Sequence, residues 1–318
     1  MDAAGNVYIA DSGYIRRVTV DGRLTTIAGN GWFGISGEGE PALSTGIDPI
    51  YVALDAKGRV CFSDSTNLRI RCLDAAPASP PVTITGVSNG ASFAAAIASG
   101  SWVSIMGANL SATSRAWQTG DFVGNTLPTK LDGVSVTING KSAAVWYISP
   151  GQLNVQAPTD SAAGTVPVVV TNTYGSAAAT ASLAQYAPGF FAIQGKYPAA
   201  VHIDGSYVAP VGYFGSSASS RPAAPGEVIL LFGTGFGPTT PTVPAGQIFG
   251  GAAPLADGTQ LRMTIGGAPA TVQFAGIVAA GEYQFNVVVP SVSDGDQAIV
   301  ATIAGFATQA GLSISVKN

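Results

Sequence analysis

The chain has 318 residues, of which 47% are hydrophobic and only 10% are charged, and its formal net charge is −4. An average soluble domain has roughly 25% charged residues, so this is an unusually uncharged chain. The negative balance excludes the basic surface that a nucleic acid or an anionic lipid surface requires. No apolar run approaches the ~20 residues of a membrane helix, so we expect no membrane insertion.

Residues 1–76 contain a short repeat, in which 2–12 match 55–65. Each copy predicts a turn, a strand, an Asp-Ser turn and a returning strand. The returning strands are expected at 14–20 and 68–73, and further strands at 24–28 and 50–55. Four short strands per roughly 40–50 residues are typical of a propeller blade. We therefore predict a partial β-propeller at 1–76, followed by a stiff linker at 77–81.

The same segment resembles the NHL repeat at residues 7–18 and 26–31, and in the loop at 34–42. In that loop Ile35, Glu38 and Glu40 depart from the usual Phe, Asp and Gly. The resemblance implies NHL-type blades. Because propellers close with roughly 4–8 blades, we expect earlier blades and a signal peptide upstream of this chain. The open propeller edge would then favour self-association.

Cys61 and Cys72 are the only cysteines, and they flank the turn at 64–67. If Ser63 lies opposite Ile70 in an antiparallel pair, the two cysteines also lie opposite each other. This register predicts a cross-strand disulfide and an oxidising compartment. Two buried free thiols are the alternative.

Residues 82–318 predict two related immunoglobulin-like β-sandwiches, at 82–186 and at 187–318 with an N-terminal hairpin insertion around Asp204-Gly205. Three blocks recur in the same order, namely 102–110 with 228–236, 136–145 with 263–272, and 152–158 with 284–290. Seven strands are expected in the first sandwich, near 82–87, 102–106, 134–138, 143–149, 152–157, 165–171 and 177–183. The predicted fold class is therefore all-β.

Nearly all of residues 84–318 resemble the uncharacterised Solibacter-type C-terminal domain family. The resemblance rests on the patterns at 86–93, 101–110, 147–158, 187–191 and 222–238. It implies tandem immunoglobulin-like modules of the IPT/TIG kind at the end of large secreted bacterial proteins, often after NHL propellers. The family implies an architecture and a location but no activity.

The sequence shows no complete catalytic constellation. His202 is the only histidine, and its neighbour Asp204 lies on the same predicted hairpin, so we interpret both as structural. One histidine and two hairpin cysteines do not make a zinc site. The glycine-rich turn at 233–237 lacks the Lys-Ser/Thr pair of a phosphate loop.

Two acidic pairs, Asp294 with Asp296 and Glu38 with Glu40, could offer oxygens to calcium, but solvated turns explain them better. As a glycosidase pair they are weaker still. We therefore expect no catalytic residue, no metal and no cofactor.

Aromatic side chains are the candidate ligand-binding residues. Trp102 and Trp146 fall in predicted strands, so we expect them in the core. An exposed loop aromatic could instead stack on a sugar or anchor a partner. The candidates are Trp117 and Phe122 in the loop at 111–127, with Tyr207, Tyr213 and Phe214 as a second surface.

These patterns predict a non-catalytic module of a secreted or cell-surface bacterial protein. Its role would be adhesion, carbohydrate or protein binding, or structural spacing, with a polysaccharide or another surface protein as partner. The alternative is an accessory region of a larger secreted enzyme whose catalytic part lies upstream.

Overall fold

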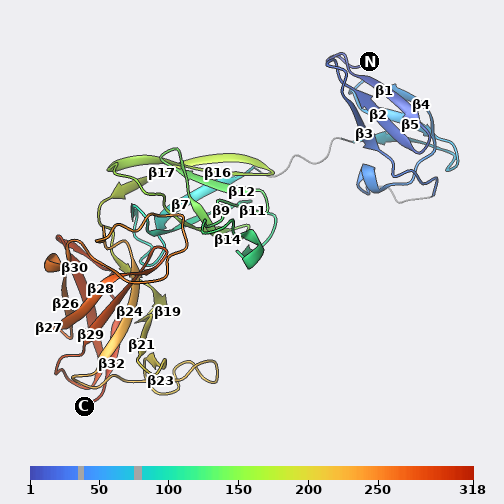
Figure 1. The fold of residues 1–318 in the computed structure, drawn as a ribbon. Coiled ribbons are helices and arrows are strands. Elements are labelled where there is room, and N and C mark those ends of the chain that lie inside the picture. The colour runs from blue at the N-terminus through green and yellow to red at the C-terminus, as the bar shows by residue number, and fades with distance from the viewer. Residues whose placement is uncertain (35–38, 75–80) are drawn as a thin grey trace. The chain divides into compact units, whose positions relative to one another are not determined.

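The computed structural model describes residues 1–34, 39–74 and 81–318. The described residues form β-strands and three short 3₁₀-helices, so the prediction of an all-β protein is confirmed. The chain divides into two compact units, Met1–Ser79 and Pro80–Asn318 (Figure 1). Most of the linker predicted at 77–81 lies outside the described residues. No helix in the described ranges is long and apolar enough to cross a membrane.

The N-terminal unit contains two antiparallel three-stranded sheets, ordered β1-β2-β3 and β4-β5-β6. Its elements are β1 (Val7–Asp11), β2 (Tyr14–Val18), β3 (Leu24–Ala28), η1 (Ala42–Ser44), β4 (Pro49–Leu54), β5 (Val60–Asp64) and β6 (Arg69–Leu73). A small core of Ile15, Ala28, Ile47, Val60 and Phe62 supports them. The expected strands are present, and the described residues form two sheets rather than a closed propeller.

The two copies of the N-terminal repeat use the same turn. Asp2 Oδ1 accepts the backbone N–H groups of Ala4 at 3.0 Å and Asn6 at 2.9 Å. Asp55, the matching residue, accepts those of Lys57 at 2.8 Å and Arg59 at 2.9 Å. Each carboxylate therefore closes a turn before a strand, which explains why the aspartate recurs.

The predicted register around the turn at 64–67 is the observed one. Ser63 lies opposite Ile70, and Cys61 lies opposite Cys72. The two Sγ atoms are 2.05 Å apart, which is a disulfide bond. It joins β5 to β6.

The first sandwich packs a sheet ordered β10-β14-β15-β9-β7 against one ordered β11-β12-β16-β17-β8, with β13 paired to β12. Its buried core alternates along the strands with outward residues, as in Val103 and Ile105 on β9. Its elements are β7 (Thr83–Asn89), β8 (Ala96–Ala98), β9 (Trp102–Ala108), β10 (Arg115–Ala116), η2 (Thr119–Asp121), β11 (Lys130–Leu131), β12 (Val134–Ile138), β13 (Lys141–Ser142), β14 (Ala144–Ile148), β15 (Gln152–Gln156), β16 (Gly164–Asn172) and β17 (Gly175–Ala184).

The second sandwich packs a sheet ordered β23-β22-β21-β24-β29-β28-β25 against one ordered β27-β26-β30-β31. β18 also pairs with β24, and β32 with β30. Its elements are β18 (Gly189–Phe190), β19 (Ala192–Ile193), β20 (Tyr197–Pro198), β21 (Ala200–His202), β22 (Tyr207–Val208), β23 (Ser220–Arg221), β24 (Val228–Thr234), β25 (Ala253–Pro254), η3 (Gly258–Gln260), β26 (Arg262–Ile265), β27 (Ala268–Pro269), β28 (Thr271–Ala279), β29 (Glu282–Val288), β30 (Gly295–Ile303), β31 (Phe306–Ala307) and β32 (Ser313–Val316).

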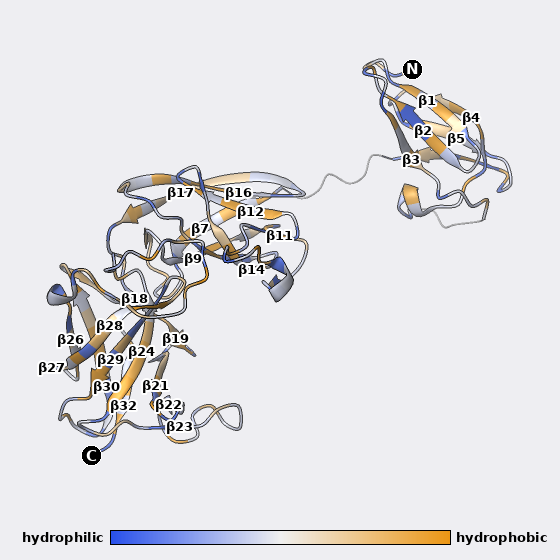
Figure 2. Cartoon of the chain, viewed as in Figure 1, coloured by the Kyte–Doolittle hydropathy of each residue, from blue (hydrophilic) through white to orange (hydrophobic). Residues whose placement is uncertain are grey.

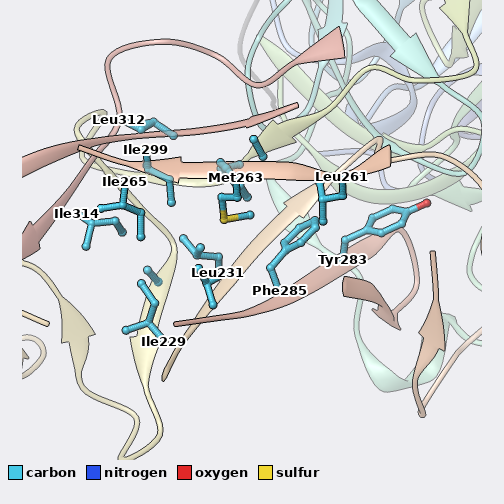
Figure 3. Close-up of a cluster of buried hydrophobic side chains, with 14 of the residues drawn as sticks. Ile229, Leu231, Leu261, Met263, Ile265, Tyr283, Phe285, Ile299, Leu312 and Ile314 are labelled. Atoms are coloured by element: carbon cyan, nitrogen blue, oxygen red, sulfur yellow. The ribbon is translucent and has the colours of Figure 1, made fainter. Parts of the chain in front are cut away.

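The core of the second sandwich is a continuous layer of apolar side chains between its two sheets. Leu231 and Phe285 from one sheet face Met263, Ile299 and Ile314 from the other (Figure 3). Hydrophobic residues are concentrated in the strands of both sandwiches (Figure 2). Burial of this apolar surface is the main stabilising term for each sandwich.

The hairpin expected around Asp204-Gly205 forms, and its first strand, β21, belongs to the main sheet. β18 and β21 both pair with β24, as β7 pairs with β9 in the first sandwich. The small β19-β20 hairpin separates them. The second sandwich therefore replaces the single strand β7 with two shorter strands and an inserted hairpin.

The duplicated apolar runs require their glycines for a steric reason. A Cβ on Gly107 would lie 2.0 Å from the carbonyl oxygen of Thr83, and one on Gly233 would lie 2.4 Å from that of Gly189. Both positions allow a neighbouring strand to approach closely, so any side chain there would push the strands apart.

His202 has a structural environment in the second sandwich. It is fully buried, with Nδ1 2.8 Å from Glu227 Oε1 and Nε2 3.0 Å from the carbonyl oxygen of Arg221. Arg221 Nη2 also donates to Glu227 Oε1 at 2.7 Å. Burial opposes the ionisation of Glu227, but hydrogen bonds from Arg221, the Ala224 N–H and His202 outweigh it and lower the pKa of Glu227 to about 2. The cluster ties β21 and β23 to the segment before β24.

We predict that Gly107→Ala destabilises the first sandwich by about 1–3 kcal/mol, because the added methyl overlaps the carbonyl of Thr83. Thermal unfolding should show the corresponding transition at a lower temperature. Gly86→Ala is the matched control, since a Cβ there meets nothing within 4 Å. Equal effects of the two variants would contradict the steric explanation.

We predict that Glu227→Gln lowers the free energy of unfolding at neutral pH by about 2 kcal/mol. The unfolding temperature should fall with it. The pKa of Glu227 falls from an ordinary 4.5 to about 2 on folding, so its stabilisation is complete above pH 4.5. It is lost as the pH falls toward 2. The difference in unfolding temperature between variant and wild type should therefore become smaller over that interval. The control Glu40→Gln, at an exposed position, should unfold at the wild-type temperature throughout. A difference that stays constant with pH would refute this assignment.

Candidate functional site

A groove of about 770 Å³ runs along the second unit between the outer face of one sheet of the first sandwich and the second sandwich. The chain has four tryptophans, and three of them, Trp102, Trp117 and Trp146, line this groove. Phe122 and Phe249 add further rings. Side chains from both sandwiches therefore form one aromatic surface.

Trp102 lies at the centre of the aromatic cluster. Its ring centroid is 6.0 Å from that of Trp117 and 5.8 Å from that of Trp146, both in edge-on contacts. Its indole Nε1–H donates to the carbonyl of Ala280 at 3.0 Å, and its backbone N–H donates to Thr234 Oγ1 at 2.9 Å. The second sandwich thus holds the central ring in place.

Trp146 reaches the groove because of a β-bulge. The register between β14 and β15 shifts between Val145 and Tyr147, so Trp146 has no partner residue on β15. Val145 and Ile148 both face the core, and Trp146 remains 41% exposed. The expectation that Trp146 packs in the core is therefore wrong, because the extra residue re-aims the side chain outward.

Trp102 also departs from its predicted place. On β9 the core residues are Val103 and Ile105, and Trp102 occupies the opposite face with Ser104. It is half-buried by the neighbouring aromatic rings and the second sandwich rather than by its own core.

The loop that carries the candidates Trp117 and Phe122 is fixed by a charged cluster. Arg115 Nη1 lies 2.7 Å from Asp121 Oδ2, and Arg115 Nη2 lies 2.8 Å from Asp132 Oδ1. Its hydrogen bonds lower the pKa of Asp121 and hold the pKa of Asp132 at about 2. Trp117 and Phe122 are in contact, with ring centroids 5.2 Å apart. The structure therefore brings both candidates together in the groove.

A long loop of the second sandwich closes the other side. The N–H of Leu127 donates to Gly246 and that of Ile248 to Asn125, each at 2.9 Å. Ile248 and Phe249 follow directly and line the groove. These backbone bonds join the two sandwiches along its rim.

Two polar side chains stand among the aromatic lining. Asn154 Oδ1 accepts from Ser104 Oγ at 3.2 Å and from Gln152 Nε2 at 2.8 Å, so its amide nitrogen is left to donate to a ligand. Glu282 is half-buried, and burial raises its pKa. An apolar surface with a few placed polar groups is typical of ligand sites.

The other candidate aromatics form a separate cluster. Tyr213 contacts both Phe214, at 5.0 Å between centroids, and Tyr197, at 4.7 Å. Tyr207 contacts Phe214 at 5.0 Å. All three candidates are partly exposed, and none of them lines the groove. The two aromatic surfaces predicted from the sequence are therefore separate in the structure, and only the one with Trp117 and Phe122 lines the groove.

The acidic pair Asp294 and Asp296 and the glycine-rich turn have local partners. Asp296 accepts from Tyr197 at 2.9 Å and pairs with Lys196 at 2.6 Å, while Asp294 accepts from Asn318. Glu38 lies outside the described residues. Within the described ranges, no group of three or more His, Cys, Asp or Glu is placed to hold a metal ion. In the turn, Thr234 Oγ1 donates to the Gly281 carbonyl at 2.7 Å and so joins two strands.

Sequence reasoning missed Trp102, Trp146, Phe249 and Glu282 as groove residues. One signal was available, because side chains point alternately to the two faces of a strand. On β9, Trp102 lies on the same face as polar Ser104 and on the face opposite to Val103. No local pattern marks the bulge at Trp146 or the approach of Glu282 from the second sandwich.

Several solved structures are remotely similar to this chain. One is a Bacteroides ovatus SGBP-B from a mixed-linkage glucan utilization locus, in complex with a mixed-linkage heptasaccharide, at 12% identity and a TM-score of 0.32, covering 95% of this chain and 51% of that one. Another is an SGBP-B from a xyloglucan utilization locus of Bacteroides uniformis, at 14% identity and a TM-score of 0.23, covering 74% and 50%. The extracellular region of plexin A4 matches at 12% identity and a TM-score of 0.25, covering 78% and 19%. The chain spans about half or less of these chains, and likenesses this weak carry no argument about function.

No curated protein matches the chain significantly. A family model matches residues 91–186, which include most strands of the first sandwich and the groove residues Trp102, Trp117 and Trp146. An IPT/TIG domain, which is immunoglobulin-like, is therefore found at residues 91–186.

Proposed function

We propose that the second unit is a non-catalytic binding module whose groove binds a polysaccharide. The observation that carries this proposal is the gathering of Trp102, Trp117, Trp146 and Phe122 along one open groove. A pyranose ring offers an apolar face that packs on aromatic rings, and hydroxyl groups at its edge that bond to polar side chains. Asn154 and Glu282 offer a donor and an acceptor there.

The groove also has the size and rigidity that a binding site requires. Its volume of about 770 Å³ falls within the ~300–1,000 Å³ of ordinary ligand pockets. Hydrogen bonds between the two sandwiches hold its walls, so little conformational entropy is lost when a ligand binds. An aromatic groove can also anchor a protein segment, and the binding test below separates the two partners.

The chemistry of the groove supports a binding role rather than hydrolysis. Glycoside hydrolysis generally uses two carboxyl groups, about 5–9.5 Å apart. Among the described residues that line the groove, Glu282 is the single carboxylate. We infer that the groove holds its ligand unchanged and that this chain serves adhesion or capture. A binding groove also fits the alternative, an accessory region of a larger secreted enzyme whose catalytic part lies upstream.

A location outside the cell is part of the same proposal. The disulfide between Cys61 and Cys72 supports an oxidising compartment. The NHL-type propeller, the Solibacter-type resemblance, and the domain boundaries at 1–76, 82–186 and 187–318 complete the proposed secreted bacterial architecture. The recurrence of the Asp2 turn at Asp55 supports the propeller repeat.

We predict that Trp146→Ala weakens binding to a responsive polysaccharide by roughly 5- to 150-fold, since stacking on one ring contributes about 1–3 kcal/mol. The measurement is a soluble-polysaccharide screen by affinity electrophoresis with the full chain, followed by calorimetry. Trp146 suits this test better than Trp117, which also packs against the core of the first sandwich.

Trp32→Ala is the matched control, because Trp32 is the fourth tryptophan, lies in the N-terminal unit and is 75% exposed. It should leave binding unchanged. Polysaccharide binding that survives Trp146→Ala would remove the groove as the site. A screen without any binding polysaccharide would refute the function and leave a protein partner or a spacer role.

A further inference from the structure

Glu282 is the single charged side chain among the described residues that line the groove. No hydrogen bond or ion pair with a described residue compensates it, and desolvation alone accounts for its raised pKa. A half-buried carboxylate without a donor is unfavourable, so a ligand that supplies a positive charge or a strong donor gains more here than in water.

The fold holds this carboxylate in place. Ala279 pairs with Glu282 across the β28-β29 turn, and the carbonyls of Ala280 and Gly281 accept from Trp102 and Thr234. Gly281 has a φ of +67°, and a Cβ on it would lie 2.9 Å from the Gly100 carbonyl oxygen. The turn therefore presses against the first sandwich and fixes Glu282 beside the aromatic cluster.

The aromatic rings favour the same charge as the carboxylate. The face of an indole ring carries negative potential and attracts a cation within about 6 Å of its centre. Trp102, Trp117 and Trp146 line the same groove as Glu282. No lysine or arginine lines the described groove to offset them. An ammonium group would be attracted by both features, and a ligand carboxylate would be repelled by both.

We propose that Glu282 selects the ligand by charge, so that the groove prefers polysaccharides of amino sugars with a free, protonated amine and rejects uronic acid polymers. This inference rests on the polysaccharide-binding function proposed above. It makes Glu282 a specificity-determining residue, separate from the rings that supply most of the contact area.

The test compares three hexamers on the full chain by calorimetry at about pH 6, where a sugar amine is largely protonated. They are the β-1,4 hexamers of glucosamine and of N-acetylglucosamine, which share one backbone, and a galacturonic acid hexamer. We expect the glucosamine hexamer to bind at least about tenfold tighter than its acetylated form, and the galacturonic acid hexamer not to bind. Raising the salt concentration should reduce the preference.

Glu282→Gln keeps the shape of the side chain and removes its charge. We expect it to weaken binding of the glucosamine hexamer by about tenfold and to change binding of the acetylated hexamer less than about twofold. Glu282→Lys should reverse the order and admit the galacturonic acid hexamer. Glu40→Gln changes the net charge equally, in the N-terminal unit, and should alter nothing.

The outcomes separate this inference from the proposed function. Equal binding of the glucosamine and acetylated hexamers, abolished by Trp146→Ala, would overturn charge selection and retain the groove. A preference for glucosamine that persists in Glu282→Gln would overturn the role of Glu282. If no hexamer binds, charge selection fails, and the wider polysaccharide screen alone decides the proposed function.

Discussion

The indole N–H of Trp102 donates to the carbonyl of Ala280 in the other sandwich, and the backbone N–H of Trp102 donates to Thr234. Thr234, which is fully buried, donates in turn to Gly281. Separating the two sandwiches would exchange these hydrogen bonds for bonds to water, at a net cost of roughly 0.5–1.5 kcal/mol each. The groove depends on this set of bonds because its walls come from both sandwiches.

The two sandwiches share one duplicated pattern, but they contribute different side chains to the groove. Gln152 donates to Asn154 at 2.8 Å, and the matching Gln284 donates to Asn286 at 2.7 Å. Both β14-β15 and β28-β29 contain a bulge after the corresponding valine, Val145 or Val272. The bulged residue is a tryptophan in the first copy and Gln273 in the second. The duplicated backbone therefore supplies the geometry, and the first copy alone supplies the central rings.

The second sandwich contributes a different chemistry to the same groove. It covers the aromatic face with Ile248 and Phe249 from the loop between β24 and β25. It also introduces Glu282, directly after the β28-β29 turn. An uncompensated carboxylate next to a row of rings is costly for the free protein and useful for a ligand of opposite charge. The arrangement separates the main contact area from charge recognition, because the three tryptophans and the carboxylate belong to different sandwiches.

Sequence reasoning recovered the strands, the hairpin at Asp204-Gly205 and the register of Cys61 with Cys72. These features follow from local alternation, turn residues and short pairings, which lie close together in the chain. The same alternation places Val103 and Ile105 inward, and so it also contained the outward direction of Trp102. The core position expected for Trp146 failed because a bulge breaks the alternation, and the residues around it carry no signal of one.

The sequence by itself determined the all-β class and the duplication, since both follow from short, repeated patterns. The steric need for glycine at Gly107 and Gly233 emerged only from the contacts between strands. Only the tertiary structure decided that Trp102, Trp117 and Trp146 share one groove, and that Glu282 lies beside them. These residues come from separate strands and loops of two sandwiches. Their meeting depends on long-range hydrogen bonds between the sandwiches and on one bulge, and no local pattern in the chain encodes either.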